Sequence, residues 1–227
     1  MALLGKAMLI NWSNVRPEDR SQYYAWHDRE HMAGRLGLPG FLRGRRLWAS
    51  DADRDVLNIY EVDDFSVLTG PAYSAKASKP SPAYLRAGRI ITDAIRALAH
   101  IRYSRGTGVG GWMLTMRFAV ADGADARTRM AERLLPEILE LEGVVGVHLC
   151  EADKRSSAVI TTDRVGRPTA VPDWAILVEA TRPQALDMCR AERLTDHALL
   201  AGGCTGPFHC GTYCLQMVMT KQDLGIA

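Results

Sequence analysis

The sequence has little of what several classes of protein require. Its 227 residues include five cysteines, an odd number that does not form a disulfide framework. The formal net charge of +2 is too small to indicate a nucleic-acid or membrane-surface partner. No apolar run reaches the roughly 18 residues that a membrane-spanning helix needs. The first residues lack a small-residue cleavage site, so we expect a strand there instead of a signal peptide, and a cytoplasmic protein.

The composition that remains is typical of a folded protein. Hydrophobic residues make up 47% of the chain and charged residues 24%, which excludes a disordered chain. The length suits one large domain or two small ones.

The pattern of apolar and polar residues predicts the same order of elements twice. In the first half we expect strands at Ala7–Trp12, Phe41–Trp48, Val56–Val62 and His100–Arg105, and helices at Pro17–Leu36 and Pro82–Leu98. In the second half we expect strands at Trp112–Val120, Val144–Glu151, Trp174–Ala180 and Tyr213–Thr220, and helices at Ala124–Leu141 and Pro183–Ala201. The order strand, helix, strand, strand, helix, strand is typical of a ferredoxin-like unit.

The predicted fold class is α+β, with two tandem ferredoxin-like units, residues 1–107 and 108–227, joined by the glycine-rich stretch 106–111. Helices on one side of each sheet leave the other side open, so the antiparallel sheets are expected to pack face to face as an α/β barrel. Each sheet would also keep edges, and we therefore expect a homodimer.

The segment from Tyr23 to Phe41 resembles the EthD-like branch of the dimeric α/β-barrel superfamily. Its first helix contains the run Trp26-His27-Asp28-Arg29-Glu30-His31-Met32, which matches the W-x-D-x-E-H-[LM] pattern of that branch, and Pro39-Gly40-Phe41 matches its strand entry. The resemblance implies a barrel, a small cavity between the first helix and the sheet, and frequent dimerisation. It also implies a range of activities, from cofactor-independent monooxygenases, cyclases and isomerases to haem-handling proteins.

Two histidines are the strongest candidates for chemistry. His27 and His31 stand four residues apart on the first helix, so they share a face, and histidine moves protons well near neutral pH. Aligning the two halves on Gly40 and Gly143 pairs His31 with Leu134 and His27 with Met130. Leucine at the matching position indicates that His31 faces inward. The run also matches the H-x-x-E-H zinc-protease pattern, but the ferredoxin-like order conflicts with that assignment.

Other candidates lie on the first two strands. Phe41, Arg43, Arg45 and Leu47 are predicted to share one face of a strand. The two arginines there would either clamp a substrate carboxylate or form salt bridges to acidic residues of the other half or of another subunit. Six residues are candidates to line a cavity, because a buried asparagine needs a partner and aromatic residues often form cavity walls: Asn11, Trp12, Tyr23, Tyr24, Trp48 and Tyr60.

The sequence therefore predicts a small-molecule enzyme without an organic cofactor. Its substrate would be a hydrophobic or aromatic metabolite, with or without a carboxylate. The reaction would be isomerisation, cyclisation, lyase-type cleavage or cofactor-free oxygenation, with His31 as general acid/base and His27 as its assistant. The alternative is a protein that binds a small ligand or haem without transforming it. No metal site is predicted, although the two histidines leave a haem or a divalent metal open.

Overall fold

The computed structural model describes residues 3–121, 123–166 and 168–226. Its core is one closed β-barrel. The barrel strands follow one another around the ring as β1 (Ala7–Val15), β3 (Val56–Val62), β2 (Phe41–Asp51), β9 (Cys204–Thr220), β5 (Trp112–Val120), β8 (Trp174–Ala180), β6 (Val144–Ala152) and β4 (Ile91–Gly106). β4 pairs again with β1 and closes the ring, and all of these pairings are antiparallel. The short strand β7 (Thr169–Ala170) joins β4 in parallel.

The two halves of the chain have the same strand order. In each half the first strand lies between the third and the fourth, and the second strand pairs with the third. The predicted α+β class and the ferredoxin-like α/β barrel are thus confirmed. The two sheets are also hydrogen-bonded to each other at their edges, because β2 pairs with β9 and β4 pairs with β6. These pairings use the sheet edges on which the expectation of a homodimer was based, and the homodimer stays a prediction.

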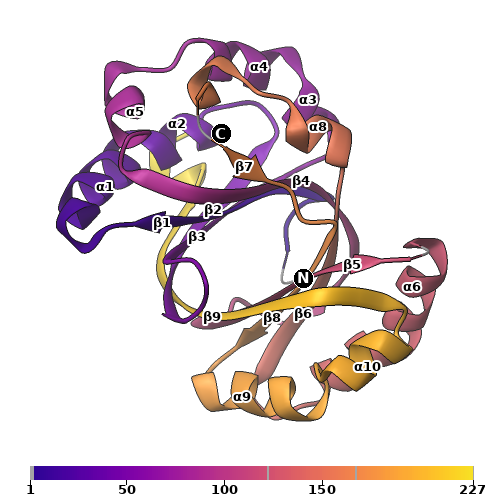
Figure 1. Ribbon diagram of the computed structural model, residues 1–227. Coiled ribbons are helices and arrows are strands. Elements are labelled where there is room, and N and C mark those ends of the chain that lie inside the picture. The colour runs from indigo at the N-terminus through magenta and orange to yellow at the C-terminus, as the bar shows by residue number, and fades with distance from the viewer. Residues whose placement is uncertain (1–2, 122, 167, 227) are drawn as a thin grey trace.

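Two helical layers cover the barrel on opposite sides (Figure 1). The upper layer begins with η1 (Pro17–Asp19), α1 (Arg20–Trp26), the π-helical turn η2 (His27–His31) and α2 (Met32–Leu36), and continues with α3 (Ser66–Thr69), α4 (Pro71–Ser78) and α5 (Pro82–Ala87). The lower layer contains α6 (Gly123–Arg129), the π-helical turn η3 (Met130–Leu134), α7 (Leu135–Leu139), α9 (Pro183–Glu192) and α10 (Asp196–Ala201). The two π-helical turns occupy the positions that the alignment on Gly40 and Gly143 equates.

One segment of the second half crosses to the upper layer. It contains α8 (Lys154–Ala158), η4 (Thr162–Arg164) and β7, and Figure 1 shows it as the orange chain beside the helices of the first half. Asp153 caps α8 by accepting a hydrogen bond from the Ser156 amide at 2.7 Å. The second half thereby contributes to the surroundings of the first-half sheet.

Apolar side chains fill the inside of the barrel and the space under each helical layer. The interior cluster takes residues from every strand of the ring, among them Trp12, Leu47, Leu57 and Tyr213. Under the lower helices a second cluster is almost entirely apolar. The upper layer covers two smaller clusters, and the space between them is where the polar residues gather.

Three predicted elements need correction. The helix expected at Pro82–Leu98 ends at Ala87, and β4 begins at Ile91, because alternate residues from there on face the barrel interior and the helical layer. The helix expected at Pro183–Ala201 is two helices, since Thr195 caps a new one by accepting from the Ala198 amide. Phe41 does not share a face with Arg43, because a register shift between them turns Phe41 to the helical layer.

Candidate functional site

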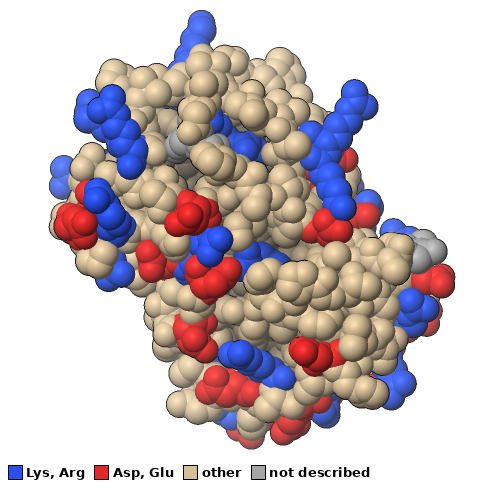
Figure 2. Space-filling view, viewed as in Figure 1, with Lys and Arg blue, Asp and Glu red and all other residues tan. Residues whose placement is uncertain are grey.

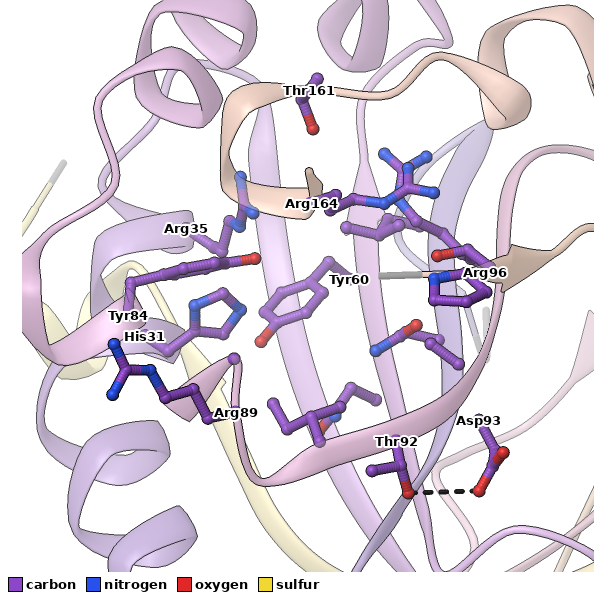
Figure 3. A pocket seen from close by; sticks show the side chains of 18 of the residues that line it. His31, Arg35, Tyr60, Tyr84, Arg89, Thr92, Asp93, Arg96, Thr161 and Arg164 are labelled. Carbon is purple, nitrogen blue, oxygen red and sulfur yellow. Dashed lines mark hydrogen bonds between the residues drawn. The ribbon is translucent and has the colours of Figure 1, made fainter. Parts of the chain in front are cut away.

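A cavity of about 440 Å³ lies between the outer face of the first-half sheet and the upper helices (Figure 3). That volume suits a small metabolite. Residues of β1, β3 and β4 form its floor, and α4, α5 and the crossing segment surround it. Its polar and aromatic lining consists of Asn11, His31, Arg35, Asn58, Tyr60, Tyr73, Tyr84, Arg89, Thr92, Asp93, Arg96, Thr161, Arg164 and Thr169. A pocket beside the first helix with His31 on its wall is what the comparison of the two halves predicted.

The floor is a polar row across three strands. Asn11 is directly opposite Asn58 on one side and Arg96 on the other, so the three side chains stand next to each other on the same face of the sheet. Asn58 is fixed by the Tyr23 hydroxyl, to which its amide donates at 2.9 Å. A sheet face that packs under helices is ordinarily apolar. This polar row therefore makes the cavity a candidate functional site.

His31 stands on the cavity wall among aromatic rings. Its ring centroid lies 4.4 Å from that of Trp26, 5.4 Å from that of Tyr84 and 6.0 Å from that of Tyr60. In Figure 3 the imidazole lies between Tyr84 and Tyr60 and faces the cavity. The π-helical turn positions both histidines, and such turns are frequent at functional sites.

His27 lies behind the wall and is not among the residues that line the cavity. It is 1% exposed, with Nδ1 at 3.3 Å from Arg46 Nη1 and Nε2 at 3.2 Å from the Tyr60 hydroxyl. Burial, together with the Arg46 charge, lowers the pKa of His27 to about 3. His27 is therefore neutral near pH 7.

The arrangement around His27 fixes the direction of its hydrogen bonds. A guanidinium group only donates, so Nδ1 of His27 accepts from Arg46 and the ring proton sits on Nε2. Nε2 then donates to the oxygen of Tyr60, whose own hydroxyl proton is left to donate elsewhere. Burial raises the pKa of Tyr60, which keeps that proton in place. Tyr60 is consequently a hydrogen-bond donor on the cavity wall.

Arg43 and Arg45 are not in this cavity. Arg43 donates to both carboxylate oxygens of Glu61 at 2.7 and 2.9 Å, and Arg45 bridges Glu61 at 3.3 Å and Glu179 at 2.9 Å. Since Glu179 belongs to the second half, this is the salt bridge between halves that the sequence left open as the alternative to a substrate clamp. The predicted substrate-binding role of the two arginines is therefore not supported by where they lie.

Tyr24 and Trp48 form a separate aromatic group on the far side of His27. Their ring centroids are 5.6 Å apart, and Arg46 lies over the Tyr24 ring at 4.7 Å. Arg46 also pairs with Asp28. Tyr24 and Asp28 contact Arg46, which in turn contacts His27, and neither Tyr24 nor Trp48 lines the cavity.

Tyr60, another of the aromatic candidates, does line the cavity, and the remaining lining residues were not predicted. Arg35 could have been found, because it follows His31 by four residues and the alignment of the halves pairs it with Ile138. Arg96 and Tyr84 could not, because the sequence pattern placed both in one long helix. Only the strand β4 brings Arg96 beside Asn11.

The second half has apolar residues at six of the lining positions. The strand registers equate Asn11, Asn58, Tyr60 and Arg96 with Met116, Ile176, Val178 and Cys210. Together with Leu134 and Ile138, which match His31 and Arg35, these residues pack in the lower cluster. The same scaffold is thus polar under the upper helices and apolar under the lower ones.

The part of the chain that the structure describes contains no group of three or more His, Cys, Asp or Glu side chains placed to hold a metal ion. Its cysteines are all free thiols. Within the same residues, no helix is long and apolar enough to cross a membrane. Basic and acidic side chains are intermixed on the face shown in Figure 2.

Known proteins resemble this chain in fold and not in sequence. No protein-family profile matches it, and no curated protein does. Among solved structures, an anthrone oxidase-like protein superposes with a TM-score of 0.67 at 13% identity, covering 97% of this chain and 95% of that one. A proposed monooxygenase from Fusobacterium nucleatum gives 0.59 at 10% identity, covering 96% of each chain. A haem-binding protein from Thermus thermophilus gives 0.52 at 11% identity, covering 98% of this chain and 94% of that one. These likenesses establish the ferredoxin-like α/β-barrel fold alone.

Proposed function

We propose that the protein is a small-molecule enzyme that performs acid/base chemistry in the first-half cavity, without an organic cofactor. The observation that carries this proposal is the difference between the halves: polar and titratable residues line the space under the upper helices, and apolar residues fill the matching space below. A purely structural role would not explain a polar side chain such as His31 at a position where the second half packs Leu134.

In this proposal His31 is the general acid/base and Tyr60 stabilises negative charge on a substrate oxygen. A histidine on the wall can remove a proton next to a carbonyl, and a donor aimed at the oxygen stabilises the enolate that forms. His27 is a positioning residue, because it is buried neutral and fixes the Tyr60 hydroxyl as a donor to the cavity. Residues 1–107 would be the active unit and 108–227 the supporting one.

The substrate class we propose is a hydrophobic or aromatic metabolite with an acidic C–H bond conjugated to a carbonyl group. Tyr60, Tyr73 and Tyr84 present aromatic surface to the cavity. An anthrone, the substrate type in the name of one structural neighbour, has this chemistry. Isomerisation, cyclisation, lyase-type cleavage and cofactor-free oxygenation all begin with such a proton transfer. The EthD-like resemblance and the repeated element order agree with this reading.

A haem is the alternative ligand, since one structural neighbour is a haem-binding protein. His31 is the residue that would ligate the iron. The rest of the lining fits a haem poorly, because four arginines, two asparagines and an aspartate surround a space in which a macrocycle needs two apolar faces. A Soret band after haem titration, abolished by His31→Ala, would favour this alternative.

The test is turnover of aromatic ketones and phenols, starting with anthrone and followed by absorbance and mass spectrometry. We expect His31→Ala to lower kcat by roughly 100- to 10,000-fold, as for loss of a general acid/base. Tyr60→Phe should lower kcat and leave KM nearly unchanged, since it removes a donor used in the transition state. His197, exposed on α10, supplies the control His197→Ala. Unchanged turnover in His31→Ala would contradict the assignment.

The homodimer and the cytoplasmic location expected from the sequence stay predictions. Light scattering at micromolar concentration tests the first of them, and a monomer mass would contradict it.

A further inference from the structure

Arg96 is a buried cation on the cavity floor. Its side chain is 7% exposed, and the residue lines the cavity from β4. The guanidinium donates to the Tyr73 hydroxyl at 2.9 Å and to the Ser157 carbonyl at 3.3 Å. Both acceptors are neutral, so they hold the group in place without balancing its charge.

Most other buried arginines in the described structure have a carboxylate beside them. Arg43 pairs with Glu61, Arg45 with Glu179, and Arg117 with Asp53. No described carboxylate forms an ion pair with Arg96. Burying a charge without a counter-charge is costly, and buried charges in folded proteins are paired or ligand-binding. The missing counter-charge therefore indicates an anion in the cavity.

Asn11 stands beside Arg96 with its amide open to the same space. The two residues are opposite each other in the pairing of β1 with β4, which places their Cβ atoms about 4.5–5.5 Å apart. Asn11 lines the cavity, and among the described residues its side chain has no hydrogen-bond partner. A guanidinium and an adjacent amide together offer several N–H donors, the arrangement that binds carboxylate oxygens.

The remaining charged residues around the cavity favour an anionic ligand. Asp93 lines the cavity as well, but it is exposed and already accepts from Asn14 and Thr92 at 3.0 and 3.2 Å. Arg89 is an exposed lining residue at the opening and can attract an anion from solution. Arg35 and Arg164 also line the cavity, and both have partners of their own. The planar guanidinium of Arg96 beside the Asn11 amide matches the two coplanar oxygens of a carboxylate.

We propose that Arg96 and Asn11 form a subsite for a carboxylate group of the substrate. The proposal rests on the proposed function for the idea that the cavity holds a substrate, and it defines that substrate as an aromatic acid. Arg96 is separated from Asn58 by two strand spacings, and Tyr60 lies two residues further along β3. Strand spacing and rise therefore place the Cα atoms of Arg96 and Tyr60 ~12 Å apart. The carboxylate therefore lies at one end of the cavity and the reacting oxygen, near Tyr60 and His31, at the other (Figure 3).

The second half again provides a comparison. Arg96 and Asn11 correspond to Cys210 and Met116, which pack in or against the lower apolar cluster. A cation is therefore not needed at this point of the scaffold for folding. Its presence in the first half is specific to the cavity.

The experiment measures binding of 2-naphthoate and of the uncharged 2-naphthamide to the whole protein by calorimetry. We expect the carboxylate to bind at least tenfold more tightly than the amide. Arg96→Gln should weaken 2-naphthoate about 10- to 100-fold, the range for a hydrogen bond to a charged group, and leave 2-naphthamide unchanged. Arg127→Gln, an exposed arginine on α6, is the control and should change neither.

Two further variants keep the test decisive. Asn11→Met introduces the residue of the second half and leaves Arg96 intact, so a folded protein is expected, with 2-naphthoate weakened about threefold to tenfold. Arg96→Lys keeps the positive charge but loses the paired N–H donors of the guanidinium. It should retain part of the preference for 2-naphthoate over 2-naphthamide. Equal affinity for acid and amide, stronger binding of 2-naphthyl phosphate, or no effect of Asn11→Met and Arg96→Lys would each overturn the proposal. His31→Ala separates the two claims, because it should abolish turnover and preserve 2-naphthoate binding.

Discussion

Replacing Arg45 with methionine tests whether the charges inside the barrel are structural. Arg45 is 1% exposed and is the guanidinium that contacts Glu179, while Glu61 keeps Arg43 as a second partner. Burial by itself would raise the pKa of Glu179, but the hydrogen bond from His148 and the charge of Arg45 lower it to about 2. Glu179 is therefore ionised at pH 7, and Arg45→Met leaves that charge buried without a cation.

The expected cost is about 3–5 kcal/mol of unfolding free energy, the range for breaking a buried ion pair by removing one partner. Arg102→Met is the matched control. Arg102 pairs with Glu151 at the surface, where both side chains are 32% exposed, and its loss should cost less than about 1 kcal/mol. Urea unfolding measures both values without adding salt that would screen the charges.

An equal cost for the two substitutions would refute the structural role of Arg45. Retained stability with loss of 2-naphthoate binding would instead restore Arg45 to the substrate-binding role that the sequence allowed. The expected result is the opposite: a less stable protein whose cavity still binds the acid.

Three further predictions concern pH, backbone and the second half. The pKa of His27 is lowered in the folded protein, so the unfolded chain binds a proton that the folded one does not between about pH 6.5 and 3. The unfolding free energy therefore falls as the pH falls through this window. Between pH 6 and pH 4, urea titrations should show a smaller fall for His27→Gln than for the unaltered protein, and an equal fall would contradict the low pKa of His27. Gly40 has φ +79°, and a β-carbon added there would meet Val67. Gly40→Ala should therefore lower the unfolding free energy by more than about 1 kcal/mol. Gly37 has a negative φ, so the control Gly37→Ala should lower it less. Met116→Asn places an amide in the lower apolar cluster and should cost about 1–3 kcal/mol in thermal or urea unfolding, and a neutral effect would show that this space is open to solvent.

Much of the fold follows from local patterns in the sequence. Strands at Val56–Val62, Trp112–Val120 and Trp174–Ala180 have the predicted bounds, because short apolar runs between turn residues can form little else. The glycines before β2 and β6 both adopt positive φ, as the end of a helix often requires. The repeated order of elements then restricts each half to one strand topology.

The comparison of the two halves also located the cavity. Leu134 at the position of His31 indicated a side chain that faces the sheet, and His31 does line the cavity. The comparison favoured His31 over His27, and only His31 lines the cavity. It did not show that His27 is buried behind the wall, where the π-helical turn sets its ring against Arg46 and Tyr60.

Tertiary structure decided which polar residues meet. Arg43 and Arg45 share one face of a strand, as the arginines of a substrate clamp would. The carboxylates that pair with them come from β3 and, in the second half of the chain, from β8. Arg96 lies in a stretch whose local pattern suits a helix, and only pairing with β1 makes it a strand and brings it beside Asn11. Local periodicity determines elements, because it depends on neighbours in sequence. The partner of a charge depends on which strands the closed barrel sets side by side, and that is a property of the whole chain.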